Sequence, residues 1–283
     1  MFRVPGCGPR QYHQQMARLA PVIACLLMLS AAPAFAAEPP QLATARALYN
    51  DANYDGAISA ASESRRLAPW ADASALVIAR SHLELYRLRA NPEDLTAARQ
   101  ALQAVRAASL TPRDQVDLLI GYGQSLYFGE LYGAAAELFD TALGGGALLG
   151  ARDRQQLLDW LATALDRDAQ SRPLDRREDV YERILRRMED ELRRDASNPT
   201  ANYWLVVSAR GTGDLERAWH AAIAAWVRAS LAPDRAAKLR EDLDRLVTQA
   251  LISDRVRARP GREQPEALAR IQAEWELVKQ LYP

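Results

Sequence analysis

The residues most able to do chemistry in this sequence are few, and their spacing matches no catalytic motif. His82 and His220 are the histidines beyond the N-terminal leader described below. His82 stands among apolar residues and His220 follows Trp219, which is typical of packed or surface histidines rather than of metal ligands or bases. The sequence contains no H-E-x-x-H, no G-x-S-x-G and no G-x-x-x-x-G-K-[ST]. We therefore expect no enzymatic activity, no metal and no cofactor.

Two other features invite a catalytic interpretation. The run Gly144–Gly150, GGGALLG, has the glycines of a phosphate-binding loop, but it lacks a preceding strand and a following Lys-Ser/Thr, so we interpret it as a break between helices. The neighbouring carboxylates Glu189 and Asp190 have the right type for acid-base work. They belong, however, to a run whose charges are four residues apart, which indicates a solvated helix face. The pairs expected there are Asp179–Arg183, Glu182–Arg186, Glu189–Arg193 and Asp190–Arg194.

The tryptophans are interpreted as packing residues. Trp219 and Trp226 are seven residues apart and so share one face of a helix, which is more often a core face than a ligand site. We expect the same of Trp70, Trp160, Trp204 and Trp275.

The N-terminus has the pattern of a secretory signal peptide over residues 1–36. Three arginines precede an apolar run at residues 20–32, and an A-x-A site predicts cleavage after Ala36. The run is too short for a membrane-spanning helix. Two alternatives remain open: residues 22–25 resemble a lipobox, which would place a lipid on Cys25, and Met16 would open a shorter leader of the same kind. The pattern predicts export, to the periplasm or beyond.

Removal of this leader changes the composition in two informative ways. The 247 residues that remain (283 − 36) contain no cysteine, since both Cys7 and Cys25 lie in the leader, so stability must come from packing rather than disulfides. The charge becomes 33 basic (36 − 3) against 36 acidic residues, a formal net of −3. Nucleic-acid binding driven by bulk charge is therefore disfavoured.

The clearest structural pattern lies between Leu119 and Leu143. Leu119, Tyr122, Gly123 and Leu126 fit the spacing of a first helix, and the second helix has an A-x3-F frame in Ala135 and Phe139, flanked by Tyr132, Ala142 and Leu143. Gly123 and Ala135 are small enough for two antiparallel helices to approach closely, and Tyr132 and Phe139 fill the space beside them. These residues resemble the tetratricopeptide repeat, a unit of 34 residues built from two helices.

The same pattern extends along the chain. A first pair of helices is expected at 41–69, a second at 72–108, and a fifth at 195–226 with Ala218 at the small position. The fourth pair is irregular: a helix carrying Leu157 to Leu165 is followed by a polar insertion at 166–177 and a charged helix at 178–194. The resemblance thus implies an all-α superhelix of about five helix pairs, a repeat domain over residues 37–233, and C-terminal capping helices over 234–283. A last helix that swings out to pair with a partner is the alternative to the cap.

What the resemblance implies about function is a concave groove, lined by the first helices, that holds a peptide or a helix of a partner protein. Tyrosine and arginine, which anchor many interfaces, are among the residues expected to line it. Matched residue by residue, these are Arg46, Tyr49, Leu76, Arg80, Gln124, Tyr127, Asp159, Thr163, Tyr203 and Arg210.

The sequence therefore favours a non-enzymatic scaffold or adaptor of the bacterial periplasm or envelope that binds another protein. Two alternatives stay open. One is a lipid-anchored structural subunit of an outer-membrane or cell-wall assembly. The other is an enzyme whose site, of acidic character, lies in the insertion at 166–177.

Overall fold

The computed structural model describes residues 37–232 and 236–283, and throughout these residues the regular structure is helical, without a strand. The expectation of an all-α fold is confirmed. The expected signal peptide, with its alternatives at Cys25 and Met16, lies outside the described residues. In the described segments, no helix combines the length and the apolar character needed to cross a bilayer.

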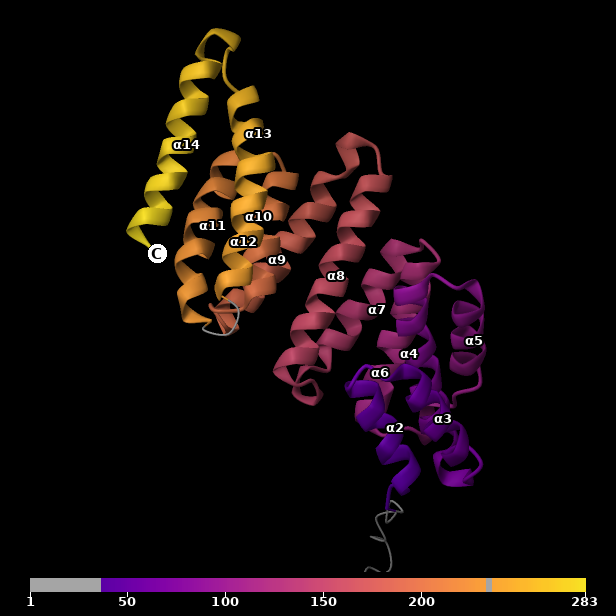
Figure 1. Ribbon diagram of the computed structural model, residues 1–283. Coiled ribbons are helices and arrows are strands. Elements are labelled where there is room, and N and C mark those ends of the chain that lie inside the picture. The colour runs from indigo at the N-terminus through magenta and orange to yellow at the C-terminus, as the bar shows by residue number, and fades with distance from the viewer. Residues whose placement is uncertain (1–36, 233–235) are drawn as a thin grey trace, which may run out of the picture. The chain divides into compact units, whose positions relative to one another are not determined.

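The helices follow one another through short connections, as Figure 1 shows. Their bounds are α2 Pro40–Asn50, α3 Tyr54–Ser64, α4 Ala71–Arg89, α5 Pro92–Gln103, α6 Pro112–Phe128, α7 Tyr132–Gly144, α8 Ala151–Ser171, α9 Glu178–Arg194, α10 Pro199–Gly211, α11 Leu215–Arg228, α12 Ala236–Leu246, α13 Ile252–Arg257 and α14 Gln264–Leu281. A π-helical turn, Val247–Leu251, joins α12 to α13.

Proline and a capping side chain mark several helix starts. Pro92, Pro112 and Pro199 occupy the first turn of α5, α6 and α10, where a missing N–H costs nothing. Immediately before α10, the Asn198 side chain accepts a hydrogen bond from the backbone N–H of Ala201 at 3.0 Å. Local sequence signals therefore set where these helices begin.

Neighbouring helices pack in pairs, and the first helices of successive pairs also meet. α2 packs on α3, α4 on α5, α6 on α7 and α10 on α11, while α4 contacts both α2 and α6. The third pair shows why small residues are needed. A Cβ added to Gly123 would lie 2.5 Å from Cε1 of Phe139, so only glycine allows α6 to approach α7 this closely. Ala135 and Phe139 are fully buried.

The fourth pair departs from this arrangement, because α9 packs more extensively on α10 than on α8. Tyr181 occupies the fourth position of α9, where α7 has the small Ala135. Its ring lies against α10 instead: a Cβ added to Gly211 would be 2.4 Å from Cγ of Tyr181. In the third pair, glycine permits the close approach of the two helices of the pair, α6 and α7. Here it permits the close approach of α9 and α10, which belong to successive pairs.

Two boundaries differ from those expected. The segment expected as a polar insertion at 166–177 is helical up to Ser171, because Leu165 and Ala169 continue the buried face of α8 by another turn. The second helix of the second pair ends at Gln103, and the chain then turns into a short 3₁₀ segment. There the backbone N–H of Arg106 donates to the buried carboxylate of Asp72 at 3.1 Å, which holds the chain away from a helical path.

The C-terminal helices fold back onto α11. Trp275 of α14 is fully buried between Trp219 and Trp226, with ring centroids 5.9 and 5.4 Å away. Ile271 and Val278 are buried on the same face. Leu268 is 39% exposed, since Ala267 occupies the buried position one residue earlier.

Candidate functional site: a groove along the first helices

Three cavities in the described residues are lined only by the first helices of successive pairs, together with α12. Side chains of α2, α4 and α6 enclose a cavity of about 210 Å³. A narrower one of about 30 Å³ lies among α2, α4, α6 and α8. An open groove of about 710 Å³ lies among α8, α10 and α12. Tyr49, Arg80 and Arg113 belong to the first two cavities, and Gln156 belongs to the narrow cavity and the open groove, so adjoining walls share residues.

Arg80 of α4 lies at the centre of the two smaller cavities. Its guanidinium stacks over the Tyr49 ring, with Cζ 4.7 Å from the ring centroid, and its Nη1 lies 3.0 Å from Oδ1 of Asp117. A cation over an aromatic face and beside a carboxylate is held firmly in one orientation. Burial raises the pKa of Tyr49 to about 12, so its hydroxyl is un-ionised near neutral pH.

The other charged groups that line the two smaller cavities are paired as well. Arg113 of α6 reaches both Asp117, at 3.3 Å, and Asp153 of α8, at 2.7 Å. Arg46 of α2 lies 2.9 Å from Asp114 of α6, whose side chain is nearly buried. These contacts join four first helices, and they leave the cavity walls close to neutral in charge.

Gln124 and Glu84 form the polar end of the narrow cavity. Both are buried, and Nε2 of Gln124 donates to Oε1 of Glu84 at 3.2 Å. The other oxygen of Glu84 accepts from Nε of Arg87 at 2.8 Å. Among the described residues, no side chain or backbone group pairs with two buried atoms of these side chains, Oε1 of Gln124 and Nε of Arg80. Such groups are uncommon in folded proteins and each requires an explanation.

Tyr203 of α10 and Asp159 of α8 face the open groove, opposite Asp242 of α12. Burial, and then the nearby carboxylates of Asp242 and Asp159, raise the pKa of Tyr203. Asp159 also accepts a hydrogen bond from Nε1 of Trp204 at 2.8 Å, which ties α10 to α8. The remaining wall combines apolar surface from Leu239 with polar side chains of α8.

The structure brings most of the expected groove residues into these walls. They are Arg46, Tyr49, Leu76, Arg80, Gln124, Asp159 and Tyr203. Leu76 and Gln124 are only 2% and 3% exposed, so they form the floor rather than the rim.

Three expected groove residues do not line these cavities. Tyr127 is half-buried in an aromatic cluster, edge-on to Trp160 at a centroid distance of 5.0 Å. Thr163 is half-buried on α8. Arg210 points away to α13, where its Nε donates to Oδ2 of Asp254 at 2.5 Å.

The wall also contains residues that the sequence alone did not single out. Most of them lie one or two helical turns from an expected residue, so the spacing i ± 3, 4 or 7 along each first helix is the signal that finds them, whereas Arg113 lies eleven residues before Gln124, three turns away. They include Glu84, Arg113, Asp117, Gln156 and Trp160.

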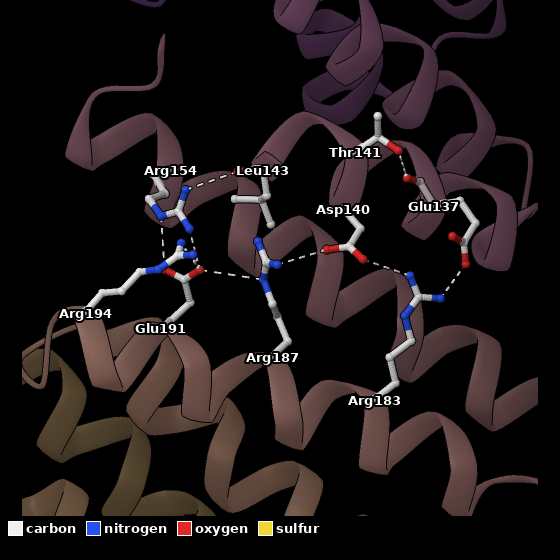
Figure 2. A network of polar contacts seen from close by, with 9 residues as sticks. All are labelled: Glu137, Asp140, Thr141, Leu143, Arg154, Arg183, Arg187, Glu191 and Arg194. Carbon is white, nitrogen blue, oxygen red and sulfur yellow. Dashed lines mark hydrogen bonds and ion pairs between the residues drawn. The ribbon is translucent and has the colours of Figure 1, made fainter. Parts of the chain in front are cut away.

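The charged helix α9 is not simply a solvated face. Figure 2 shows a network in which Arg183 and Arg187 of α9 reach Asp140 of α7, at 3.2 and 3.3 Å. The buried Glu191 accepts two hydrogen bonds from Arg154 of α8, at 3.0 and 2.5 Å. The carboxylate of Glu191 therefore joins α9 to α8, and the carboxylate of Asp140 joins α9 to α7.

Of the four intrahelical pairs expected along α9, the described contacts include only Glu182 with Arg186, at 3.0 Å. The others were wrong because competing partners lie closer. Arg183 pairs with Glu137 and Asp140 of α7, and Glu189 pairs with Arg217 of α11, whereas Asp190 pairs with Arg193 of the same helix, one residue nearer than Arg194.

The two histidines lie on α4 and α11. Nδ1 of His82 is 2.9 Å from Oδ1 of Asp94 at the start of α5, and His220 is exposed. The expected tryptophan packing is confirmed for Trp204, Trp219, Trp226 and Trp275, which are buried, while Trp70 and Trp160 are half-buried.

Scans of this sequence and structure against protein-family models, curated proteins and solved structures found no match.

Proposed function

We propose that this protein is a repeat protein of the tetratricopeptide type and that it binds a peptide or a helix of a partner protein along the groove of its first helices. The observation that carries this proposal is that three adjoining cavities are lined only by α2, α4, α6, α8, α10 and α12. In a repeat array, equivalent helices present equivalent faces, so a ligand that follows the array contacts several repeats at once.

The proposal includes the finer architecture implied by the sequence: a superhelix of about five helix pairs, closed at its end by α12 to α14. The burial of Gly123 against Phe139 and of Ala57, Ala135 and Ala218 at 0% exposure supports it, because these are the positions where the repeat requires small residues. The role is that of a non-enzymatic scaffold, exported to the periplasm or envelope of a bacterium after cleavage at Ala36.

The test is capture of the partner from the native envelope fraction by the tagged full chain after mild cross-linking. The groove variant is Gln156→Arg, since Gln156 is exposed and borders both the narrow cavity and the open groove. The matched control is Gln272→Arg, an exposed glutamine on α14. We expect the wild type and the control to capture a stoichiometric partner. The groove variant should capture at least tenfold less of that partner.

Equal capture by both variants, or no partner at all, would overturn the proposal. The N-terminus read in the same experiment tests the export route. A terminus at Ala37 supports a cleaved, unanchored protein, whereas an acylated Cys25 would make it a lipid-anchored structural subunit of an envelope assembly.

A further inference from the structure

The open groove among α8, α10 and α12 is the widest of the three cavities described above. Its volume is about 710 Å³, whereas the other two measure about 210 and 30 Å³. Ligand sites in proteins typically enclose about 300 to 1,000 Å³. Of the three cavities, the open groove is therefore the one with room for several residues of a partner.

The open groove lies at the amino-terminal ends of its three helices. Arg152, Thr200 and Lys238 belong to the first turns of α8, α10 and α12, and the other lining residues lie at most two turns further along. Each first helix is followed by a helix that returns, so α8, α10 and α12 run in the same direction (Figure 1). The groove thus has one end at the first turns and another end about two turns further along.

The two side walls of the groove carry charges in the same order. On α8, Arg152 in the first turn is followed by Asp159, and on α12, Lys238 in the first turn is followed by Asp242. Since each helical residue rises about 1.5 Å, the opposite charges are about 10 Å apart along α8 and about 6 Å apart along α12. The end at the first turns is therefore positive, and the other end is negative.

The two carboxylates act on the same point of the groove from opposite walls. Tyr203 lies on α10, which contacts both α8 and α12. Burial raises the pKa of Tyr203, and the charges of Asp242 and Asp159 raise it further. Tyr203 is half-buried, so part of its side chain is open to the groove. A cation at this end would meet two carboxylates and an aromatic side chain.

These charged groups are able to pair with a ligand. Arg152 is exposed and contacts no carboxylate among the described residues. Asp242 lies 3.4 Å from Lys238 and 3.8 Å from Arg245, but these two side chains are 76% and 54% exposed, and exposed ion pairs contribute little to stability. Asp159 accepts one hydrogen bond from an indole N–H, whereas a carboxylate can accept about four. A ligand can therefore pair here without breaking a buried contact.

The width of the groove favours an extended ligand over a helix. Packed helices lie about 8 to 10 Å apart, so α8 and α12, on either side of α10, are about 16 to 20 Å apart. Because a helix with its side chains is about 10 Å wide, roughly 6 to 10 Å remain between the two walls. A single extended chain needs about 5 Å, and its side chains alternate between the two walls.

We propose that the open groove binds an extended partner segment that carries one acidic and one basic side chain three residues apart. The acidic side chain pairs with Arg152 or Lys238, and the basic side chain pairs with Asp159 or Asp242. Three residues of extended chain span about 10 Å, which matches the separation of the charges on α8. An apolar residue between them packs on Leu239. This inference rests on the proposed groove function and specifies the class of segment that the groove recognises.

The experiment is a titration of the ¹⁵N-labelled full chain with four blocked hexapeptides, followed by NMR. The mixed peptide is acetyl-Ala-Glu-Leu-Ala-Lys-Ala-amide. The acidic, basic and neutral peptides carry glutamate, lysine or glutamine at both the second and the fifth position. We expect the mixed peptide to bind about tenfold more tightly than each of the others, because it alone forms an ion pair at both ends of the groove. The backbone amide of Tyr203 should be among the shifted resonances.

The salt concentration gives a second readout. Because the paired charges are exposed, the advantage of the mixed peptide should shrink as salt is added. Equal binding of the four peptides, tighter binding of the acidic or the basic peptide, or no saturable shift with the mixed peptide would overturn the proposal.

Two charge reversals test the assigned residues. Arg152→Glu removes a cation from the positive end, so the mixed peptide should lose its advantage over the basic peptide. Asp242→Lys removes a carboxylate from the negative end, so the mixed peptide should lose its advantage over the acidic peptide. The matched control is Arg270→Glu, an exposed arginine on α14, which should keep the wild-type preference. Unchanged preferences in both groove variants, with folding verified by circular dichroism, would overturn the assignment.

The outcomes separate the two proposals. Capture of a partner that is lost in Gln156→Arg, together with equal binding of the four peptides, would leave the scaffold function standing and remove the charge pattern as its specificity. Selective binding of the mixed peptide without any captured partner would do the reverse.

Discussion

The third and fourth helix pairs solve the same packing problem with different chemistry. In the third pair, Gly123 lets α6 approach α7, and the fully buried Phe139 fills the space between them. We call the contact surface between the two helices of a pair its seam. In the fourth pair, Tyr181 replaces the small residue, α9 packs less on α8, and the carboxylate of Glu191 bridges the two helices through Arg154. The contact within the third pair is apolar, whereas the contact within the fourth pair adds the ionic network of Figure 2 to its buried apolar side chains.

The difference shows which changes each helix pair tolerates. A seam of close-packed apolar residues depends on volume, so a change of one methyl group matters at Gly123. An ionic seam depends on pairing, so a change of charge matters at Glu191 even when volume is kept. The predictions below test each seam by the change to which it is sensitive.

The largest effect is expected from Phe139→Ala in the third pair. Removing a fully buried aromatic ring leaves a cavity beside Gly123, and such changes lower the free energy of unfolding by about 3 to 5 kcal/mol. Urea unfolding, followed by circular dichroism, measures this loss of unfolding free energy. A loss below about 1 kcal/mol would show that the seam does not depend on this ring.

In the fourth pair, Glu191→Gln keeps volume and removes the charge that faces Arg154, Arg187 and Arg194. We expect a loss of roughly 2 to 3 kcal/mol in urea unfolding, because the arginine charges stay partly buried without their carboxylate. The control is Glu182→Gln on the same helix, which contacts the exposed Arg186 and should change stability by less than about 0.5 kcal/mol. Similar values for the two variants would mean that the network contributes nothing beyond a surface pair.

The junction between the fourth and fifth pairs should be sensitive to volume at Gly211. In Gly211→Ala the new methyl group would overlap the Tyr181 ring, so we expect a loss of about 1 to 3 kcal/mol. Gly144→Ala is a matched control, because Gly144 also ends a helix and a Cβ there would meet nothing within 4 Å. If both alanine variants were equally stable, Tyr181 would not depend on the glycine opposite it.

The smallest effect is a pH dependence in the fourth pair. Burial, and the carboxylate of Asp166 whose oxygen accepts from Tyr181 at 2.9 Å, raise the pKa of Tyr181 to about 12. Because the folded pKa lies above the unfolded value of about 10, this tyrosine contributes stability that is complete below pH 10 and is lost as the pH rises towards 12.

Tyr181→Phe should therefore make the decline of unfolding free energy between pH 10 and 12 shallower than in the wild type. A residual slope is expected, since the pKa of Tyr49 is raised to about 12 as well. The measurement is urea unfolding at a series of pH values across this window. Parallel profiles for the variant and the wild type would contradict the prediction.

The sequence by itself determined the all-helical class and many of the helix starts, because these signals act locally. Pro112 and Pro199 restrict the backbone at their own positions, and the Asn198 cap reaches three residues along the chain. The positions of the small and large residues in the third pair could also be predicted, since Gly123, Ala135 and Phe139 belong to one short helical hairpin. The face of each first helix was predictable for the same reason, and seven of the ten expected groove residues line the cavities described above.

Only the tertiary structure decided which charges pair and where an oversized side chain packs. Arg154 and Glu191 are 37 residues apart, and Arg210 and Asp254 are 44 apart, so their contact depends on how whole helices cross rather than on spacing along one helix. The i, i+4 rule predicted solvated pairs along α9, but a carboxylate on a neighbouring helix competes with one on the same helix.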